Sequence, residues 1–408
     1  MKKWTLNLAD IFFKHTYFLT ALLTVAVLFA GFGVRYVEVG HLFYDDTDSY
    51  MRLLRISDWL ANFEWSERLF PYTNPPSGFE LHFTRIMDVI WVVLSVPFMV
   101  FMPLKEALFY GGYLISPLFL VLVMFTLVQY YKAVLPPMHG QKIFFLFGVV
   151  YSLMLILKLS DVFDFYRPDH HAVMCFFFVY NVCVILHGYR QKNLWQYAGA
   201  GFLIGLGVWA SSAIEGFMIV AALLSVLCVE WIFGQRSTKY LVFYTLGFFA
   251  ALTLAWLINP PLGGLMVLNN TRLSLIHVVA AALIFLSFLF IDWRHPHRTG
   301  VKIIYLVGTA AVSIMLMILI FGWKQFTVPV YQPLVKQYFL PHITEMFPAW
   351  KFPFLIYSYI FCWVEIIILL ALSKFRLPDL NLLAFLTVFI SIYSLLVVRF
   401  YPYFLMLY

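Results

Sequence analysis

The chain has 408 residues, of which 63% are hydrophobic and 12% are charged, and its mean hydropathy is +0.88. A soluble domain of this size does not need so much apolar surface, so the composition excludes an ordinary globular protein and indicates a polytopic membrane protein. The formal charge of +7 comes from basic residues that are spread over the loops, which argues against a nucleic-acid partner.

Apolar stretches close to or beyond the roughly 18 residues of a membrane-spanning helix follow one another along the chain. They lie at about 16–36, 88–104, 107–130, 143–160, 172–188, 196–213, 216–233, 240–258, 273–291, 302–322, 353–372 and 380–398. The stretch 88–104 is short and contains Asp88 and Pro97, so we expect that it does not cross. The basic residues then gather in the cytoplasmic loops, which predicts about eleven spans with the N-terminus inside and the C-terminus outside.

The predicted architecture is an all-α bundle of transmembrane helices that forms one domain, 1–408. Its extracytoplasmic face carries a long first loop at 35–105, which includes non-spanning helices, a second loop at 160–172 and a late loop at 323–352. Most of the acidic residues fall in these loops. Because acidic residues have little influence on topology, their accumulation on one face needs another explanation.

The first loop contains Asp45, Asp46 and Asp48 in four consecutive positions. Clustered carboxylates suit a hard divalent cation such as Mg²⁺ or Mn²⁺, and they raise one another's pKa, which prepares a general base. An alternative is that Asp and Ser side chains here cap a helix that begins near Tyr50, and both interpretations hold together. His82, later in the same loop, is a weaker candidate for a metal ligand.

The second loop contains Arg167, Asp169, His170 and His171 within a segment of five residues. Charged groups at membrane depth are costly and usually line a functional cavity, and two imidazoles beside a carboxylate are metal ligands. The alternative is that Asp169 only caps the next helix, with the histidines at a wet interface. The common face with Asp46 and Asp48 favours the metal site.

Two residues near the end of the chain complete the candidate site. Glu345 is the acidic residue of the late loop, and its alternative is a solvated glutamate. Arg399 follows the last predicted span, where its guanidinium can hold a lipid phosphate, and its alternative is an interfacial anchor. Arg167 is a weaker candidate for the same phosphate.

These segments together resemble the membrane part of the catalytic subunit of oligosaccharyltransferase, a GT-C glycosyltransferase. The segment Asp48-Ser49-Tyr50 is similar to the family's motif with an essential aspartate after the first helix. Asp169-His170-His171 resembles the Asp-x-His metal motif of archaeal members, which implies that Asp169 and His171 are ligands and that His170 takes no part. Ile343-Thr344-Glu345 and the Arg399-Phe400 segment resemble the late glutamate motif and the arginine that contacts the lipid-linked pyrophosphate.

The resemblance implies a GT-C fold and a metal-assisted transfer of a sugar or oligosaccharide from a polyprenyl-(pyro)phosphate donor. The expected metal is Mn²⁺ or Mg²⁺, held by Asp48, Asp169 and His171, while Asp46 or Glu345 orients or deprotonates the acceptor. The acceptor is a protein, lipid or glycan on the periplasmic or exterior face of a cytoplasmic (inner) membrane. The family's soluble Trp-Trp-Asp domain has no counterpart in this sequence, so we expect a minimal or truncated member of the family, or a partner subunit that supplies the domain.

Two other classes of function remain open at this level. A transporter or lipid flippase would also be a polytopic bundle, although such proteins commonly show internal repeats and helices broken near the midplane, whereas here no repeat is visible and the acidic residues cluster in loops. A non-catalytic, degenerate membrane subunit of a glycosylation complex is the second alternative. A transfer assay with a lipid-linked sugar separates both from the enzyme.

Overall fold

A computed structural model describes residues 17–26, 42–134 and 163–325, with short gaps in each range, together with 364, 367 and 387. The described elements that are longer than a turn are all α-helices. The chain divides into two compact units, Met1–Cys183 and Val184–Tyr408. Helix α9, His170–Gln191, contributes residues to both units.

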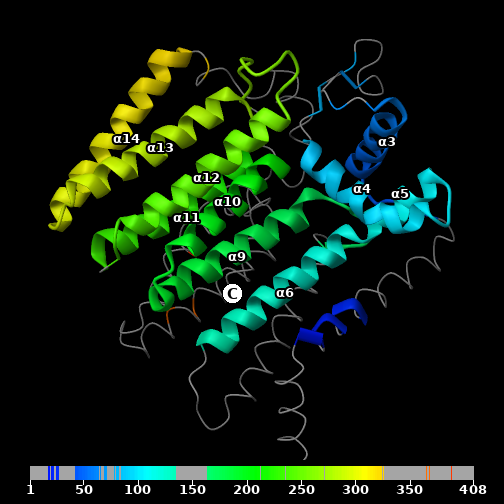
Figure 1. Ribbon diagram of the computed structural model, residues 1–408, viewed down its shortest axis with the longest axis horizontal. Helices are drawn as coiled ribbons and strands as arrows, with labels where there is room; N and C mark the ends of the chain where they lie inside the picture. Colours follow the sequence, from blue (N-terminus) through cyan, green and yellow to red (C-terminus); the bar gives the residue numbers. More distant parts are fainter. Residues whose placement is uncertain are drawn as a thin grey trace, which may run out of the picture. The chain divides into compact units, whose positions relative to one another are not determined.

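The first unit contains α3 (Thr47–Asn62), α4 (Arg85–Met99), α5 (Leu104–Tyr113) and α6 (Ile115–Val134), all visible in Figure 1. Helices α4 and α5 form a hairpin. Pro103 is the N-cap of α5, a position at which proline favours the start of a new helix rather than the continuation of the previous one. The indole Nε1 of Trp91 in α4 donates to the carbonyl of Leu108 in α5 at 2.6 Å. The hairpin is therefore held by a buried hydrogen bond as well as by apolar contact.

Tyr44, just before α3, is buried against this hairpin. Its hydroxyl donates to the carbonyl of Phe109 at 3.1 Å, and its ring stacks on the Phe109 ring with centroids 4.7 Å apart. A Cβ atom at Gly112 would meet both the Tyr44 hydroxyl and the Trp91 ring, so only glycine fits at that position. The start of the first loop is thus fixed onto α4 and α5.

The stretch predicted not to cross, 88–104, is divided between α4 and the turn that follows it. Helix α4 has 15 residues, which is shorter than a membrane-spanning helix requires. The stretch predicted at 107–130 begins earlier than expected, because a single apolar segment, Leu104–Ala133, runs through α5 and α6 with a break at Leu114. The glycine pair Gly111-Gly112 lies two to three residues before that break.

The second unit contains the rest of α9 and the helices α10 (Leu194–Ala210), α11 (Ala213–Phe233), α12 (Lys239–Ile258), α13 (Leu275–Arg294) and α14 (Thr299–Phe321). They lie side by side in Figure 1, with contacts that join α10 to α12, α12 to α13 and α13 to α14. The closest approach is between α10 and α12, where a Cβ at Gly201 would strike the Tyr244 carbonyl and one at Gly247 would strike the Ala198 carbonyl. Small residues commonly permit such backbone contact between membrane helices.

Six helical segments among the described residues are long and apolar enough to cross a membrane. They coincide with predicted stretches, and the ends differ from the predicted ends by a few residues. Helix α10, with 17 residues, matches the predicted stretch 196–213 but falls just short in length. The stretch at 143–160, nearly all of 353–372 and 380–398, and most of 16–36 lie outside the described residues, so the eleven spans and their orientation stay predictions.

Candidate metal centre

The segment before α9 is a tight turn that presents Arg167 and Asp169 at the helix start. The Asp164 carboxylate accepts from the Tyr166 N–H at 3.0 Å, and the Arg167 carbonyl accepts from the Asp169 N–H at 2.8 Å. The Arg167 carbonyl also accepts from the hydroxyl of Ser116, in the first turn of α6, at 3.0 Å. The motif is therefore fixed to the end of an apolar helix.

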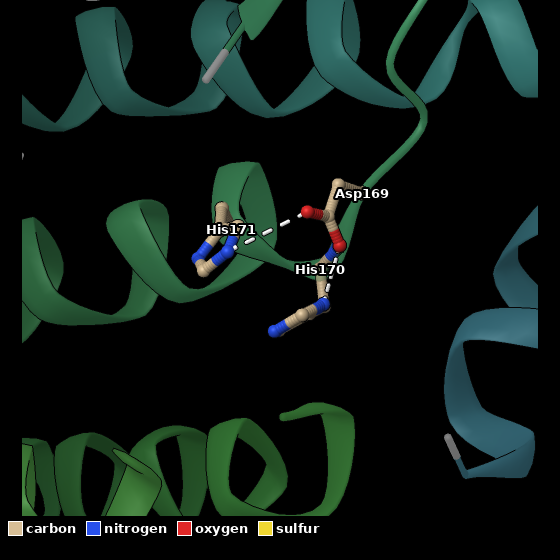
Figure 2. A group of neighbouring side chains, drawn as sticks. All are labelled: Asp169, His170 and His171. Carbon is tan, nitrogen blue, oxygen red and sulfur yellow. Dashed lines mark hydrogen bonds and ion pairs between the residues drawn. The ribbon is translucent and has the colours of Figure 1, made fainter. Parts of the chain in front are cut away.

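Asp169 and the two histidines that follow it form a compact group at the first turn of α9 (Figure 2). Nδ1 of His170 contacts one carboxylate oxygen of Asp169, while Nε2 of His171 lies 3.5 Å from the other oxygen. The Oδ1 atom of Asp169 also accepts from the N–H of the next residue, His170, at 2.6 Å, which holds the carboxylate against the first residue of the helix. One potential ligand atom from each of the three residues lies within 4.8 Å of the others.

The electrostatic surroundings keep Asp169 ionised. Its side chain is only 8% exposed, and burial alone would raise its pKa. The charges of His170 and His171, the hydrogen bond from His170 and the charge of Arg167 outweigh burial and hold the pKa well below its usual range. Asp169 is thus held as a carboxylate, the form that binds cations, whereas the two imidazoles bind a metal only in their neutral form.

The acidic segment of the first loop reaches the same turn. The N–H of Asp45 donates to the Tyr166 carbonyl at 2.9 Å, and the Phe43 ring stacks on the Tyr166 ring with centroids 4.4 Å apart. The Nε atom of Arg167 donates to Oδ2 of Asp46 at 3.2 Å. The predicted convergence of the two loops is therefore present in the described structure.

Asp46 is the N-cap of α3. Its Oδ1 atom accepts from the Ser49 N–H at 2.6 Å, while its Oδ2 atom accepts from Arg167. Both oxygens are thus engaged, and the capping interpretation of the aspartate cluster is correct for this residue.

Asp48 is half-buried in the first turn of α3. Burial raises its pKa, and the nearby charges of Asp169 and Asp46 raise it further, against the opposite effects of Arg52 and His170. Asp48 therefore lies within electrostatic reach of the Asp169 group, and the repulsion between these carboxylates is of the kind that a bound cation relieves.

Of the residues predicted from the sequence, the structure brings together Asp46, Asp48, Arg167, Asp169 and His171. It also includes His170, which we expected to take no part. The sequence carried the signal for His170, since the two histidines are adjacent, but the motif comparison favoured His171 alone. His82, Glu345 and Arg399 lie outside the described residues.

The donor set fits a divalent transition metal. Imidazole nitrogens suit such ions, whereas Mg²⁺ prefers ligands that are all oxygen. Ligand atoms that lie within 4.8 Å of one another need only small side-chain movements to reach metal bonds of about 2.0–2.2 Å. The residues present therefore suit a divalent transition metal better than Mg²⁺.

The described residues form an all-α bundle with six helical segments long and apolar enough to cross a membrane, as in a multi-pass membrane protein, and the chain shares its fold with solved oligosaccharyltransferase structures. It is similar to the archaeal oligosaccharyltransferase AglB from Archaeoglobus fulgidus, solved in complex with an inhibitory peptide and a dolichol-phosphate, with a TM-score of 0.67 and 16% identity over 97% of this chain and 49% of that one. The apo crystal structure of the Archaeoglobus fulgidus oligosaccharyltransferase gives a TM-score of 0.64 and 17% identity over the same shares.

A third crystal structure of the Archaeoglobus fulgidus enzyme, in complex with Zn and sulfate, matches 88% of this chain and 43% of that one with a TM-score of 0.51 and 17% identity. The chain thus spans about half the length of the solved structures it matches. No protein-family model and no curated protein sequence matches it. At this identity the likeness establishes the fold, and the activity is argued from the site.

Proposed function

We propose that the protein is a membrane glycosyltransferase that moves a sugar or oligosaccharide from a polyprenyl-(pyro)phosphate donor to an acceptor at the extracytoplasmic face. The observation that carries the proposal is the contact between the two loops. Arg167 joins Asp46 of the first loop to the Asp169 group of the second. The same turn supplies a carboxylate and two imidazoles whose potential ligand atoms lie within 4.8 Å of one another.

Asp169, His170 and His171 would hold the divalent metal, with Asp48 as a further carboxylate. A metal in that position supplies Lewis-acid stabilisation of the phosphate leaving group, which is worth several kcal/mol in such reactions. The protein side chains do the rest of the work. Asp169 stays ionised, and Asp48 contributes a second negative charge whose repulsion with Asp169 disfavours the site without a cation.

Asp46 and Arg167 have a positioning role in this proposal. Because both oxygens of Asp46 already accept hydrogen bonds, it orients the acceptor side of the site rather than removing a proton. Arg167 is 28% exposed, so its guanidinium can face an anionic group while it still holds Asp46. Glu345 remains the candidate base, and Arg399 remains the candidate ligand of the lipid phosphate.

The nature of the donor and acceptor rests on the solved structures that share the fold. One of them was solved with a dolichol-phosphate and an inhibitory peptide. We propose a polyprenyl-linked donor whose tail lies among the helices and an acceptor class that includes peptides. A catalytic centre on the outer face of a cytoplasmic membrane follows from the predicted topology.

The test is a transfer assay with the purified full chain in nanodiscs, a lipid-linked sugar and Mn²⁺. Asp169→Ala and Asp48→Ala should each lower the rate by about 100-fold or more, because a metal contributes several kcal/mol and each 1.4 kcal/mol is a factor of ten. The matched control is Glu106→Gln, which removes an exposed acid from the same unit and should leave the rate unchanged.

Chelation gives a second measure of the same proposal. EDTA should abolish transfer, and added Mn²⁺ should restore it. Equal activity of the wild type and both alanine variants would sink the catalytic proposal, and sugar-independent uptake of solute into proteoliposomes would favour a transporter instead.

A further inference from the structure

A carboxylate that the proposed reaction does not use lies directly behind α3. Asp88 of α4 is fully buried, with no exposed surface. Its carboxylate meets Arg55 Nε at 3.0 Å, an Arg85 terminal nitrogen at 3.3 Å and an Arg52 terminal nitrogen at 3.7 Å. One buried acid thus faces three buried arginines, two of which come from α3.

Arg85, the third arginine of this cluster, is also held in place by its own contacts. The Nε atom of Arg85 donates to the Trp65 carbonyl at 3.2 Å, and its guanidinium lies over the rings of Trp59 and Trp65. Because Arg85 lies one helical turn before Asp88, it fixes the orientation of the carboxylate. Asp88 therefore presents a fixed negative charge to the inner face of α3.

Arg52 links this cluster to the candidate metal centre. It follows Asp48 by one helical turn on α3, a spacing at which an aspartate and an arginine attract each other. Burial lowers the pKa of Arg52, while the charges of Asp88, Asp169 and Asp48 raise it. The Arg52 guanidinium is therefore attracted both by Asp88 and by the two carboxylates proposed to bind the metal, Asp48 and Asp169.

A guanidinium and a divalent cation compete for the same carboxylates, since each is stabilised by their negative charge. We propose that Asp88 is a positioning residue that sets the metal affinity of the site by competing with Asp48 and Asp169 for Arg52. When Asp88 pairs with the Arg52 guanidinium, the carboxylates of Asp48 and Asp169 are available to bind the metal. The inference rests on the metal site of the proposed function and adds a residue that touches neither metal nor substrate.

The test is a titration of the purified full chain with Mn²⁺, followed by electron paramagnetic resonance, which needs no transfer activity. Asp88→Asn should weaken Mn²⁺ binding by about 10- to 100-fold, the range found when supporting partners of metal ligands are removed. Arg52→Gln should bind at least as tightly as the wild type, because Asp88 keeps Arg55 and Arg85 as partners. The double variant should return to the level of Arg52→Gln, and Glu106→Gln is the control.

The rescue by the second substitution separates charge competition from a general loss of structure. If Asp88→Asn binds Mn²⁺ like the wild type, or if the double variant stays as weak as Asp88→Asn, the inference is overturned while the metal site stands. If Asp88→Asn does not fold, weaker binding by Arg52→Gln alone overturns it, and equal or tighter binding supports it. A wild-type protein that binds no Mn²⁺ would instead refute the metal site itself.

Discussion

Arg167 and Asp46 are 121 residues apart in the chain, and the Nε atom of the first donates to Oδ2 of the second at 3.2 Å. A terminal nitrogen of the same guanidinium lies 3.8 Å from Asp169. A single side chain therefore bridges the cap of α3 and the start of α9, the two elements that bring acidic residues to the candidate metal centre. The bridge adds to the backbone hydrogen bond from Asp45 to Tyr166 and to the stacked rings of Phe43 and Tyr166, which join the same two loops.

Replacement of Arg167 by glutamine should lower the transfer rate by about tenfold or more, as losses of supporting contacts around a metal do. Stability should change little, because a partly exposed ion pair contributes only about 1 kcal/mol or less. Arg167→Lys keeps the charge but loses the planar guanidinium that reaches both Asp46 and Asp169, so its transfer rate should fall between those of the wild type and Arg167→Gln. Transfer kinetics together with thermal unfolding measure both effects, and a large loss of stability in Arg167→Gln would contradict this account.

The two roles of Asp46 can be separated by a pair of substitutions. Asp46→Asn keeps a good capping side chain but loses the charge that pairs with Arg167, whereas Asp46→Ala loses both. We expect Asp46→Ala to lower the free energy of unfolding by about 0.5–2 kcal/mol, the usual cost of a lost N-cap, and Asp46→Asn to change it much less. Both should slow transfer. Equal stability of the two variants would show that the cap is not what Asp46 contributes.

His170 and His171 should contribute comparably to metal binding. Each contacts a different oxygen of Asp169, and each contributes one ring nitrogen to the same group of potential ligand atoms. Alanine at either position should weaken Mn²⁺ binding by about 10- to 100-fold, in line with losses at and around metal ligands. Metal titration monitored by electron paramagnetic resonance checks this, and wild-type affinity in His170→Ala would restore the simpler site of Asp169 and His171.

The contact between α10 and α12 gives a test of the fold within one helix. A Cβ at Gly201 would collide with backbone atoms of Tyr244 and Phe248, which cannot move aside, whereas nothing lies within 4 Å of a Cβ at Gly199. Gly201→Ala should therefore destabilise the protein by about 1–3 kcal/mol, as overpacking does. Gly199→Ala should be neutral or stabilise it by up to about 1 kcal/mol through helix propensity. Thermal unfolding of both variants in the same detergent decides the matter.

The sequence predicted the long apolar helices well, because a run of twenty apolar residues has few other structures available to it in a membrane. Helices α11 to α14 lie close to their predicted positions. The break at Leu114 was not predicted, since Gly111 and Gly112 look like ordinary members of an apolar run. The two glycines are required by tertiary packing, because α5 lies tightly against Ser95 and Trp91 of α4.

The sequence predicted which types of residue form the candidate site, but it did not predict the buried ion pairs that lie behind it. Asp88 entered the sequence argument only as a charge that makes a span unfavourable. Its partners Arg52 and Arg55 come from another helix, and no spacing in the sequence announces an ion pair between separate helices. The contact between His170 and Asp169 was not predicted for a related reason: which of two adjacent side chains reaches a carboxylate depends on the turn that precedes the helix, and that turn is set by Asp164 and Ser116.

The division of one apolar segment into α5 and α6 has a consequence for the alignment of reactants. The 20 residues of α6 are about 30 Å long, which alone matches the hydrocarbon thickness of a bilayer. Helix α5 is then an extension that carries the first loop, while Ser116, at the base of α6, holds the carbonyl of Arg167. Helix α6 would therefore set how far the candidate site lies above the lipid tails. The phosphate of a lipid-borne donor has a height set by the bilayer itself, so we expect the reaction to be sensitive to membrane thickness.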